Sequence, residues 1–318
     1  MPKPTLSEVH YDEVLSEISV AYIQKADRYI AAKVFPVVEV SHRTGKFRKW
    51  NKNDWHRIEA KKRAPGTESA GSGFGFDSYG TYSCDTWAIH HDVPREHRAN
   101  ADFDLLKTAT LFVTDQLLKA REKAWADAFF KAGVWGTDWV GGTDFTAWDQ
   151  ANSTPIEDIQ NAKLKIEKST GYTPNVLVLG VAVYETLKNH DSIIERYKYT
   201  QEGIVTADLL ARVFDVDRIV VPRAIYATNE EGASESYDFM FNNHALLVYV
   251  PDNPSLLTPA GGYIFTWTGE GLPGYEVTIA RLEMPWKKAE RVEGEANWDM
   301  QLVSSDVGLF FQNAVTAI

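Results

Sequence analysis

The sequence has a single cysteine, Cys84, and no long apolar run. One cysteine excludes an intramolecular disulfide and leaves too few ligands for a cysteine-based structural zinc site. No stretch approaches the roughly 18 consecutive apolar residues of a membrane span. The first residues, Met1 to Glu13, lack the basic and then apolar layout of a secretion signal. We therefore expect a protein that contacts no membrane and stays in the cytosol of the cell that makes it.

Basic residues are outnumbered by acidic ones, and the net charge is −11 over 318 residues. Such a surface repels a polyanion and argues against tight, general nucleic-acid binding. The basic residues are nevertheless concentrated. Between Ser41 and Arg63 there are nine lysines and arginines but two acidic residues, so this segment carries about +7 and the remainder about −18. One short segment is thus complementary in charge to the rest of the molecule.

Catalytic motifs are scarce. The glycines of residues 71–75 resemble a phosphate-binding turn, but neither the dinucleotide fingerprint nor the Walker pattern is complete. The histidines and carboxylates from His90 to His97 match no common zinc spacing. We interpret the first segment as a hairpin tip and the second as a polar strand-to-helix joint, and expect no catalytic, metal or cofactor site. A carbohydrate-active enzyme built around the tryptophans and abundant carboxylates remains an alternative.

The first third of the chain has features of an arm and a long excursion. Thr5 to Ala32 has no apolar run able to bury itself, which indicates a mostly extended arm. Val34 to Val40 predicts a strand because of its valines. Ala64 to Tyr82 is rich in glycine and serine and supplies turns without a helical period. With a return strand over Thr81 to His90, these features predict a two-stranded excursion from the body.

Helices and strands then alternate. Apolar residues step by three and four from Leu106 to Ala128, which predicts a helix of about 45 Å that begins at Asn100 or Asp102 and ends near Lys131. The residues from Thr154 to Gly171 predict a second helix, and those up to Val221 predict short strands and helices of a compact α/β lobe. Alternating apolar residues from Val292 to Leu302 predict a long half-buried strand.

The basic segment has three interpretations. It could bind nucleic acid with Trp50 and Trp55 stacking on bases, it could be a solvated charged hairpin, or it could lie on an acidic neighbour. Because identical neighbours share the acidic surface, we favour the third. The residues expected to make these inter-subunit contacts are Arg43, Lys46, Arg48, Lys49, Trp50, Lys52, Trp55, Arg57, Lys61, Lys62 and Arg63.

Several segments, in number and order, are similar to a known family. They are residues 18–24 (ISVAYIQ), 33–36 (KVFP), 63–68 (RAPGTE), 98–102 (RANAD), 133–136 (GVWG), 153–158 (STPIED), 199–201 (YTQ), 244–249 (HALLVY) and 291–295 (RVEGE). Through them the chain resembles, over nearly its whole length, the major capsid proteins of tailed bacteriophages, whose fold is named after phage Hong Kong 97. None of these segments is a catalytic signature.

The resemblance implies an α+β, Hong Kong 97-like capsid fold and a structural, non-enzymatic protein. Its implied parts are an N-terminal arm (1–36), an extended loop (37–90), a peripheral domain with a long spine helix (91–151), an axial α/β domain (152–270) and C-terminal peripheral strands (271–318). The loop that faces the symmetry axis is expected at Tyr197, Lys198, Tyr199, Thr200, Gln201 and Glu202.

The same resemblance implies partners. Copies of the chain would form pentamers and hexamers of an icosahedral virion capsid in the bacterial host cytoplasm, and the shell would enclose double-stranded DNA without sequence-specific binding. We expect the chain to lack the cleavable N-terminal scaffold region of many members and therefore expect a separate scaffolding protein, together with a portal and a cement protein. The shell of an encapsulin-like nanocompartment, which shares the fold but encloses enzymes, is the alternative within the same architecture.

Overall fold

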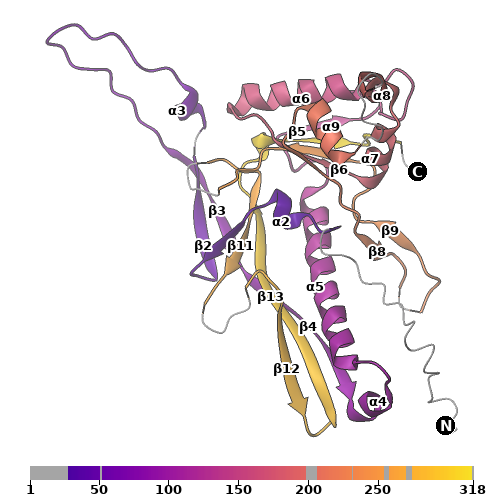
Figure 1. Ribbon diagram of the computed structural model, residues 1–318. Coiled ribbons are helices and arrows are strands. Elements are labelled where there is room, and N and C mark those ends of the chain that lie inside the picture. The colour runs from indigo at the N-terminus through magenta and orange to yellow at the C-terminus, as the bar shows by residue number, and fades with distance from the viewer. Residues whose placement is uncertain are drawn as a thin grey trace.

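The computed structural model describes residues 28–50, 52–197, 206–230, 232–253, 258–269 and 274–316. Within these residues the chain forms two five-stranded sheets and two separate two-stranded ribbons. Figure 1 shows a compact upper lobe, an elongated lower part along a long helix, and a loop that projects from the side. The predicted mixture of helices and strands is confirmed. The N-terminal arm falls almost entirely outside the described residues.

The upper lobe is built on a sheet of strand order β5-β14-β10-β6-β7. Its strands are β5 (Thr137–Val140), β6 (Val176–Leu179), β7 (Arg218–Val220), β10 (Ala245–Val248) and β14 (Gly308–Gln312). The surrounding helices are α6 (Pro155–Thr170), α7 (Val181–Lys188), α8 (Asp191–Tyr197) and α9 (Ala207–Phe214). Helix α6 begins with Pro155 and ends at Gly171, whose φ of 75° provides the left-handed cap.

Both faces of this sheet are buried, which explains the nearly continuous apolar runs of its central strands. Leu177 and Leu179 of β6 face the same cluster as Ile159 of α6, whereas Val176 and Val178 face a second cluster that contains Trp125. Side chains alternate between the faces of a strand, so one strand joins two cores. The upper lobe is therefore packed firmly onto the lower part.

The lower part is a sheet of strand order β1-β11-β13-β12, with β4 also paired to β13. Its strands are β1 (Val37–Val40), β4 (Asp85–Pro94), β11 (Gly262–Trp267), β12 (Thr278–Met284) and β13 (Ala289–Leu302). Helix α5 (Leu105–Phe129) packs along it, and the short helices α2 (Ala31–Val34) and α4 (Arg95–Asn100) lie near the two ends of α5. The predicted late half-buried strand is β13.

The remaining described elements are the two ribbons and two short helices. One ribbon pairs β2 (Thr44–Trp50) with β3 (Phe76–Ser83), and the other pairs β8 (Ile225–Ala227) with β9 (Tyr237–Phe239). The helices are α3 (Lys52–His56) and the 3₁₀ turn η3 (Ser305–Val307). No helix in the described ranges is long and apolar enough to span a bilayer.

The predicted start of the long helix was wrong, whereas its end lies near the predicted one. The long helix begins after Asp104, whose carboxylate accepts hydrogen bonds from the backbone N–H groups of Leu106 and Lys107, and not after Asn100 or Asp102. Asn100 instead ends the separate helix α4, and Ala101 is extended, which breaks the helical path. The long helix ends at Phe129, two residues before the predicted Lys131.

The strands of the upper sheet do not all lie between residues 152 and 270, the predicted limits of the axial domain. The upper sheet takes in β5, which precedes residue 152, and β14, which follows residue 270. Conversely, β11 lies within the predicted limits but pairs with β1 and β13 of the lower sheet. The chain passes between the two parts more often than a contiguous division allows. The division of the chain into arm, extended loop, peripheral domain and axial domain by these residue limits stays a prediction.

Candidate assembly surface

The root of the projecting loop is an antiparallel ribbon clamped by aromatic rings. Phe47 of β2 and Tyr82 of β3 both stack on Phe265 of the lower sheet, with ring centroids 5.5 and 4.7 Å apart. Across the ribbon Phe47 covers Gly80, where an added Cβ would lie 2.1 Å from the ring. The glycine thus leaves room for the ring, and the stacking fixes the direction in which the loop leaves the body.

The buried Cys84 lies just below this clamp and accounts for the only thiol of the sequence. Its Sγ is 3.5 Å from the carbonyl oxygen of Phe265. Burial raises the pKa of the thiol to about 11, so the reactive thiolate is scarcely formed at neutral pH. Cys84 is a packing residue of the root.

Polar contacts also hold the root to its own subunit. Arg43 pairs with Asp85 at 2.8 Å, Lys52 pairs with Asp306, and Lys49 Nζ donates to the carbonyl oxygen of Leu302 at 3.4 Å. Such exposed pairs add little to stability and mainly orient the ribbon. Three cations that we expected to contact a neighbour therefore already have partners within the chain.

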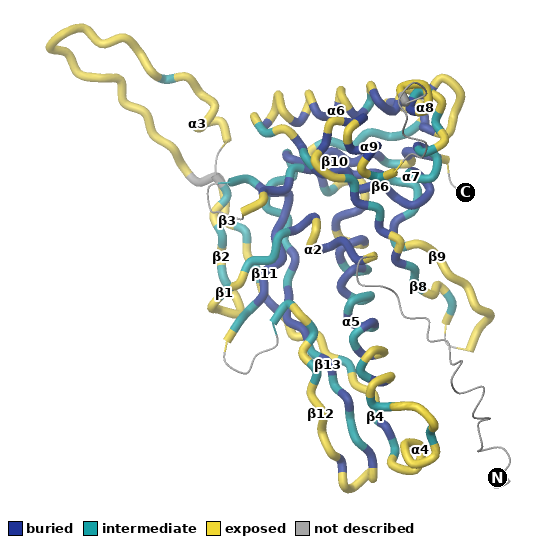
Figure 2. The backbone as a smooth tube through the Cα atoms, in the orientation of Figure 1, coloured by how far each residue is buried: buried dark blue, intermediate teal, exposed yellow. Residues whose placement is uncertain are grey.

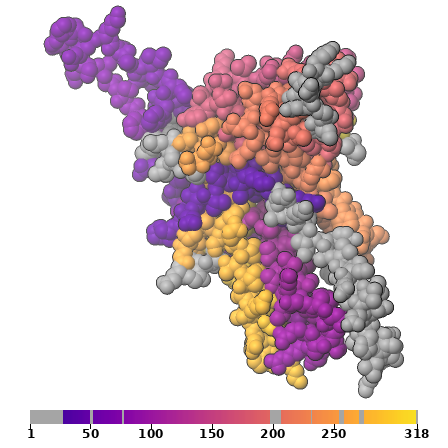
Figure 3. Space-filling view, viewed as in Figure 1, coloured from indigo at the N-terminus to yellow at the C-terminus, as the bar shows by residue number. Residues whose placement is uncertain are grey.

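The distal part of the loop differs, because residues 57–75 are exposed with the single exception of Glu59 (Figure 2). Its two ends are held together by a hydrogen bond from Gly75 N to Asp54 Oδ2 at 3.0 Å and by contact of the Trp55 and Phe74 rings at 5.4 Å. Ile58 is 94% exposed, Phe74 64% and Trp55 55%. Figure 3 shows this segment standing off the body as a thin arm.

The cations of the distal loop lie on this arm. Lys61, Lys62 and Arg63 are exposed, and no ion pair among the described residues includes them. Arg57 is paired with Glu59 at 3.2 Å. The chain then turns at Gly66, which has a φ of 81° and is followed by a hydrogen bond from Thr67 N to the carbonyl oxygen of Ala64. Consecutive cations beside exposed apolar residues are typical of a protein interface with a charged rim.

The other predicted contact residues are placed less completely. Lys46 and Arg48 are exposed on β2, and the placement of the Trp50 side chain is outside what the structure describes. Of the predicted axis-facing loop, Tyr197 is the last residue of α8, and Lys198 to Glu202 lie outside the described residues. The assignment of that loop stays a prediction.

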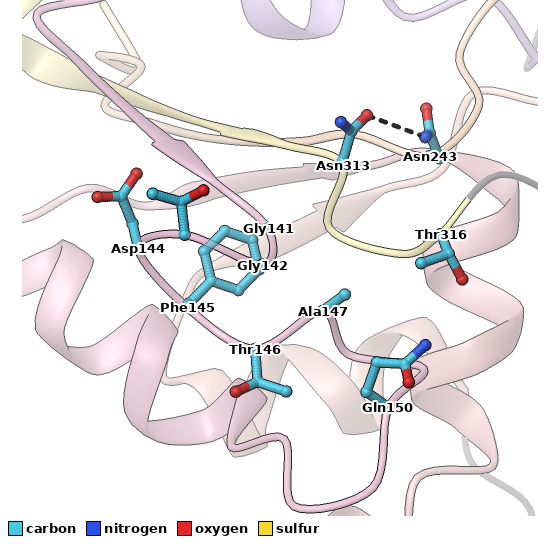
Figure 4. Close-up of a pocket in the computed structure, with 11 residues that line it drawn as sticks. Gly141, Gly142, Asp144, Phe145, Thr146, Ala147, Gln150, Asn243, Asn313 and Thr316 are labelled. Atoms are coloured by element: carbon cyan, nitrogen blue, oxygen red, sulfur yellow. Dashed lines mark hydrogen bonds between the residues drawn. The ribbon is translucent and has the colours of Figure 1, made fainter.

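The structure also has two concave sites that the sequence did not indicate. One, of about 700 Å³, lies at the loop root between Phe47, Trp55, Tyr172 and Tyr263. The other, of about 730 Å³, is formed by the turn after β5 and the end of β14 (Figure 4). Side chains from segments far apart in sequence line both cavities, so no local motif could reveal them.

The cavity of Figure 4 has no arrangement for chemistry among its described groups. Asp144 Oδ2 accepts a hydrogen bond from Val140 N at 2.8 Å, and Asn243 Nδ2 donates to Asn313 Oδ1 at 3.2 Å. These polar groups stabilise the turns of the cavity wall. In the described part of the chain no group of three histidine, cysteine or acidic side chains could hold a metal ion.

One serine–histidine contact resembles a nucleophile and its base. Ser153 Oγ lies 2.9 Å from His190 Nε2. However, His190 Nδ1 accepts a hydrogen bond from Ser192 N at 3.3 Å, so the proton of the neutral ring is on Nε2. Burial lowers the pKa of His190, which favours that neutral form. The ring therefore donates to Ser153 and is not oriented to remove its proton.

Comparison with known proteins identifies relatives of the chain. Residues 141–269 match the family model described as phage major capsid protein E. The major capsid protein of Burkholderia phage BcepMu is 28% identical over 292 residues, covering 86% of this chain and 89% of the relative. That of Pseudomonas phage JBD67 is 25% identical over 314 residues, covering 96% and 97%. The crystal structure of a phage-related protein from Bordetella bronchiseptica has a TM-score of 0.71 at 26% identity, with 95% of each chain covered.

The long helix, the two sheets and the projecting loop are those of an α+β capsid fold of the Hong Kong 97 type. The architecture and the matches along nearly the whole chain make it similar to structural proteins of viral shells. In sequence and in architecture the chain is similar to the major capsid proteins of phages.

Proposed function

We propose that this chain is the major capsid protein of a tailed phage and assembles with copies of itself into pentamers and hexamers of an icosahedral head. The observation that carries the proposal is the exposed distal loop, where Ile58, Trp55 and Phe74 lie beside a run of three cations. These apolar side chains have little shelter within the subunit. Their burial against a neighbour is favourable by about 25 cal/mol for each Å² removed from water.

Shell formation follows from many such contacts acting together. Each subunit contributes one loop and receives another, so every contact in a closed ring is repeated around the symmetry axis. A single contact of modest strength becomes effective because the remaining contacts hold the partners at high local concentration. In this proposal the chain works by association and catalyses no reaction.

The proposed partners follow from the similarity to phage major capsid proteins. A separate scaffolding protein would set the curvature of the shell, and a portal and a cement protein would complete the head, which assembles in the cytoplasm of the bacterial host. The head would enclose double-stranded DNA, and the net charge of −11 supports a wall that does not grip it. Retention of purified subunits on DNA at physiological salt would contradict this part.

Electron microscopy and sedimentation of the expressed protein test the proposal. The wild-type chain, with its scaffolding protein where required, is expected to form closed shells. Reversing the charges of the distal loop with Lys61→Glu, Lys62→Glu and Arg63→Glu should abolish them. The charge-conserving triple variant Lys61→Arg, Lys62→Arg and Arg63→Lys is the matched control and should form shells at wild-type yield. Unchanged shells in the reversed variant would contradict the role of the loop.

A further inference from the structure

A second projection, the β8–β9 ribbon, leaves the body on the side opposite the loop (Figures 1 and 3). All residues from Gly232 to Phe239 are exposed, including all three residues of β9. Tyr237 is 61% exposed and Phe239 38%. These two aromatic residues are two positions apart in a strand and thus lie on the same face of the ribbon. Together they form an aromatic face that is largely exposed in the described part of the chain.

The charge of this ribbon is opposite to that of the distal loop. Residues 225–239 include four acidic residues and no lysine or arginine. Among the described ones, Glu230, Glu235 and Asp238 are exposed. An acidic, aromatic projection on one side of the subunit is therefore complementary to a basic, apolar projection on the other side.

The ribbon is ordered and firmly rooted although it projects. Thr228 and Ser236 are joined by a backbone hydrogen bond of 2.9 Å and a hydroxyl hydrogen bond of 2.8 Å. At its base Lys123 of the long helix lies 4.9 Å from the centre of the Tyr226 ring, and Arg223 pairs with Glu185 at 2.6 Å. A two-stranded ribbon of this size has marginal stability alone in water, so a defined shape with exposed aromatic residues favours a partner.

We propose that the β8–β9 ribbon is the receptor for the distal loop of an adjacent copy of this chain. Lys61, Lys62 and Arg63 of one subunit lie against Glu230 and Glu235 of the next, and Asp238, on the other face of β9 from Tyr237 and Phe239, adds to the negative charge of the ribbon. The exposed apolar residues of the loop, Ile58 among them, cover Tyr237 and Phe239. This inference rests on the proposed function and adds the surface that the loop occupies.

The arrangement explains how rings can close. The donor and the receptor are different surfaces on opposite sides of one subunit, so the contact is heterologous. After each addition a heterologous contact leaves one unoccupied ribbon and one unbound loop at the two ends of the growing oligomer. A ring forms when the rotation from one subunit to the next brings these two ends together. The acidic receptor also disfavours nucleic acid as the occupant.

A charge swap tests the pairing. Glu230→Lys, Glu235→Lys and Asp238→Lys together should lower the yield of sedimenting shells by about tenfold or more, because like charges then meet at the contact. Combining them with Lys61→Glu, Lys62→Glu and Arg63→Glu should restore most of the yield, although each triple variant alone fails. Circular dichroism and the melting temperature of each variant establish that the subunits are folded.

Cross-linking provides a second readout that does not depend on yield. Shells of a variant that carries only Ile58→Cys and Tyr237→Cys, treated with a short bis-maleimide, should give a ladder of linked chains on denaturing gels. Ile58→Cys with Leu164→Cys is the control, since Leu164 is 63% exposed on α6, away from the ribbon. A ladder in the control alone would contradict the contact between loop and ribbon, and so would shells that form normally with the three lysine substitutions in the ribbon. Neither result would contradict the proposed shell function. Failure of the wild-type chain to form shells would instead contradict the proposed function.

Discussion

At the residue scale, Glu122 of the long helix α5 holds the beginning of the short helix α2. It is buried, and its carboxylate accepts hydrogen bonds from the backbone N–H groups of Ile30 at 2.9 Å and Ala31 at 3.1 Å. Burial raises its pKa to about 7, although the two backbone hydrogen bonds act in the opposite direction. The attachment of α2 to α5 therefore depends on a group that titrates near neutral pH.

The raised pKa of Glu122 predicts a pH dependence of stability. Between its ordinary value of 4.5 and about 7 the folded protein keeps a proton that the unfolded chain has lost. The stabilisation is thus fully present below about 4.5 and is lost as the pH rises through about 7. Glu122→Gln cannot titrate, so its free energy of unfolding relative to wild type should rise by on the order of 3 kcal/mol between pH 4 and pH 8. Urea denaturation of assembly-deficient subunits measures this difference.

The free energy of unfolding of the variant must be compared with that of the wild type at each pH, because other carboxylates stabilise the folded protein at high pH and not at low pH. Hydrogen bonds from Arg291 and Lys287 hold the pKa of Asp92 well below its usual range, so the stabilisation from Asp92 is lost as the pH falls. The difference between variant and wild type cancels that contribution. A flat difference for Glu122→Gln would contradict the assignment.

Packing of the long helix on the lower sheet depends, at the element scale, on a glycine. Gly294 of β13 lies directly under α5, and an added Cβ would come 2.4 Å from Val113 Cγ1 and 3.1 Å from Leu117 Cδ1. Both side chains are buried in well-packed surroundings and have little room to move. The glycine therefore sets how closely the helix approaches the sheet.

Gly294→Val is predicted to destabilise the subunit by about 1–3 kcal/mol, since overpacking of a filled core pushes the helix from the strand. Thermal unfolding of the soluble subunit measures the loss. Gly71→Ala is the matched glycine control, because an added Cβ at Gly71 meets nothing within 4 Å. Equal melting temperatures for Gly294→Val and wild type would show that the helix is not held at this distance.

The elements differ in how well the sequence predicts them. The helix α5 was predicted because its apolar residues recur at helical spacing, whereas its start was misplaced because Asn100, Asp102 and Asp104 are all suitable caps. The parallel pairing of β5 with β14 could not be predicted, since it joins four-residue segments about 170 positions apart. The β8–β9 ribbon was missed because three-residue strands carry no usable period.

The candidate surface was likewise predicted in part. The charge imbalance of residues 41–63 pointed to a contact with an acidic neighbour, and the structure places its distal cations on an exposed arm. The sequence could not separate them from Arg43, Lys49 and Lys52, which bond to partners distant in sequence but close in the fold. Exposure decides which cations are available to a neighbour, and it depends on tertiary structure.

At the scale of the whole molecule, the subunit has a stable centre and two projections of opposite charge. The centre contains both sheets and the buried clusters on either face of the upper one. The distal loop contributes nothing to those clusters, so its removal should leave the fold intact. Because Gly75 N is bonded to Asp54 Oδ2, the two ends of the loop already lie together and a short linker can join them.

Replacement of residues 58–72 by a short glycine–serine linker, followed by sedimentation and electron microscopy, tests the central claim most directly. We expect a folded subunit, with a circular dichroism spectrum and melting temperature close to those of wild type, that sediments slowly and forms no shells. Shells of normal size and yield from this shortened chain would contradict the proposed role of the loop, because assembly would then not require it.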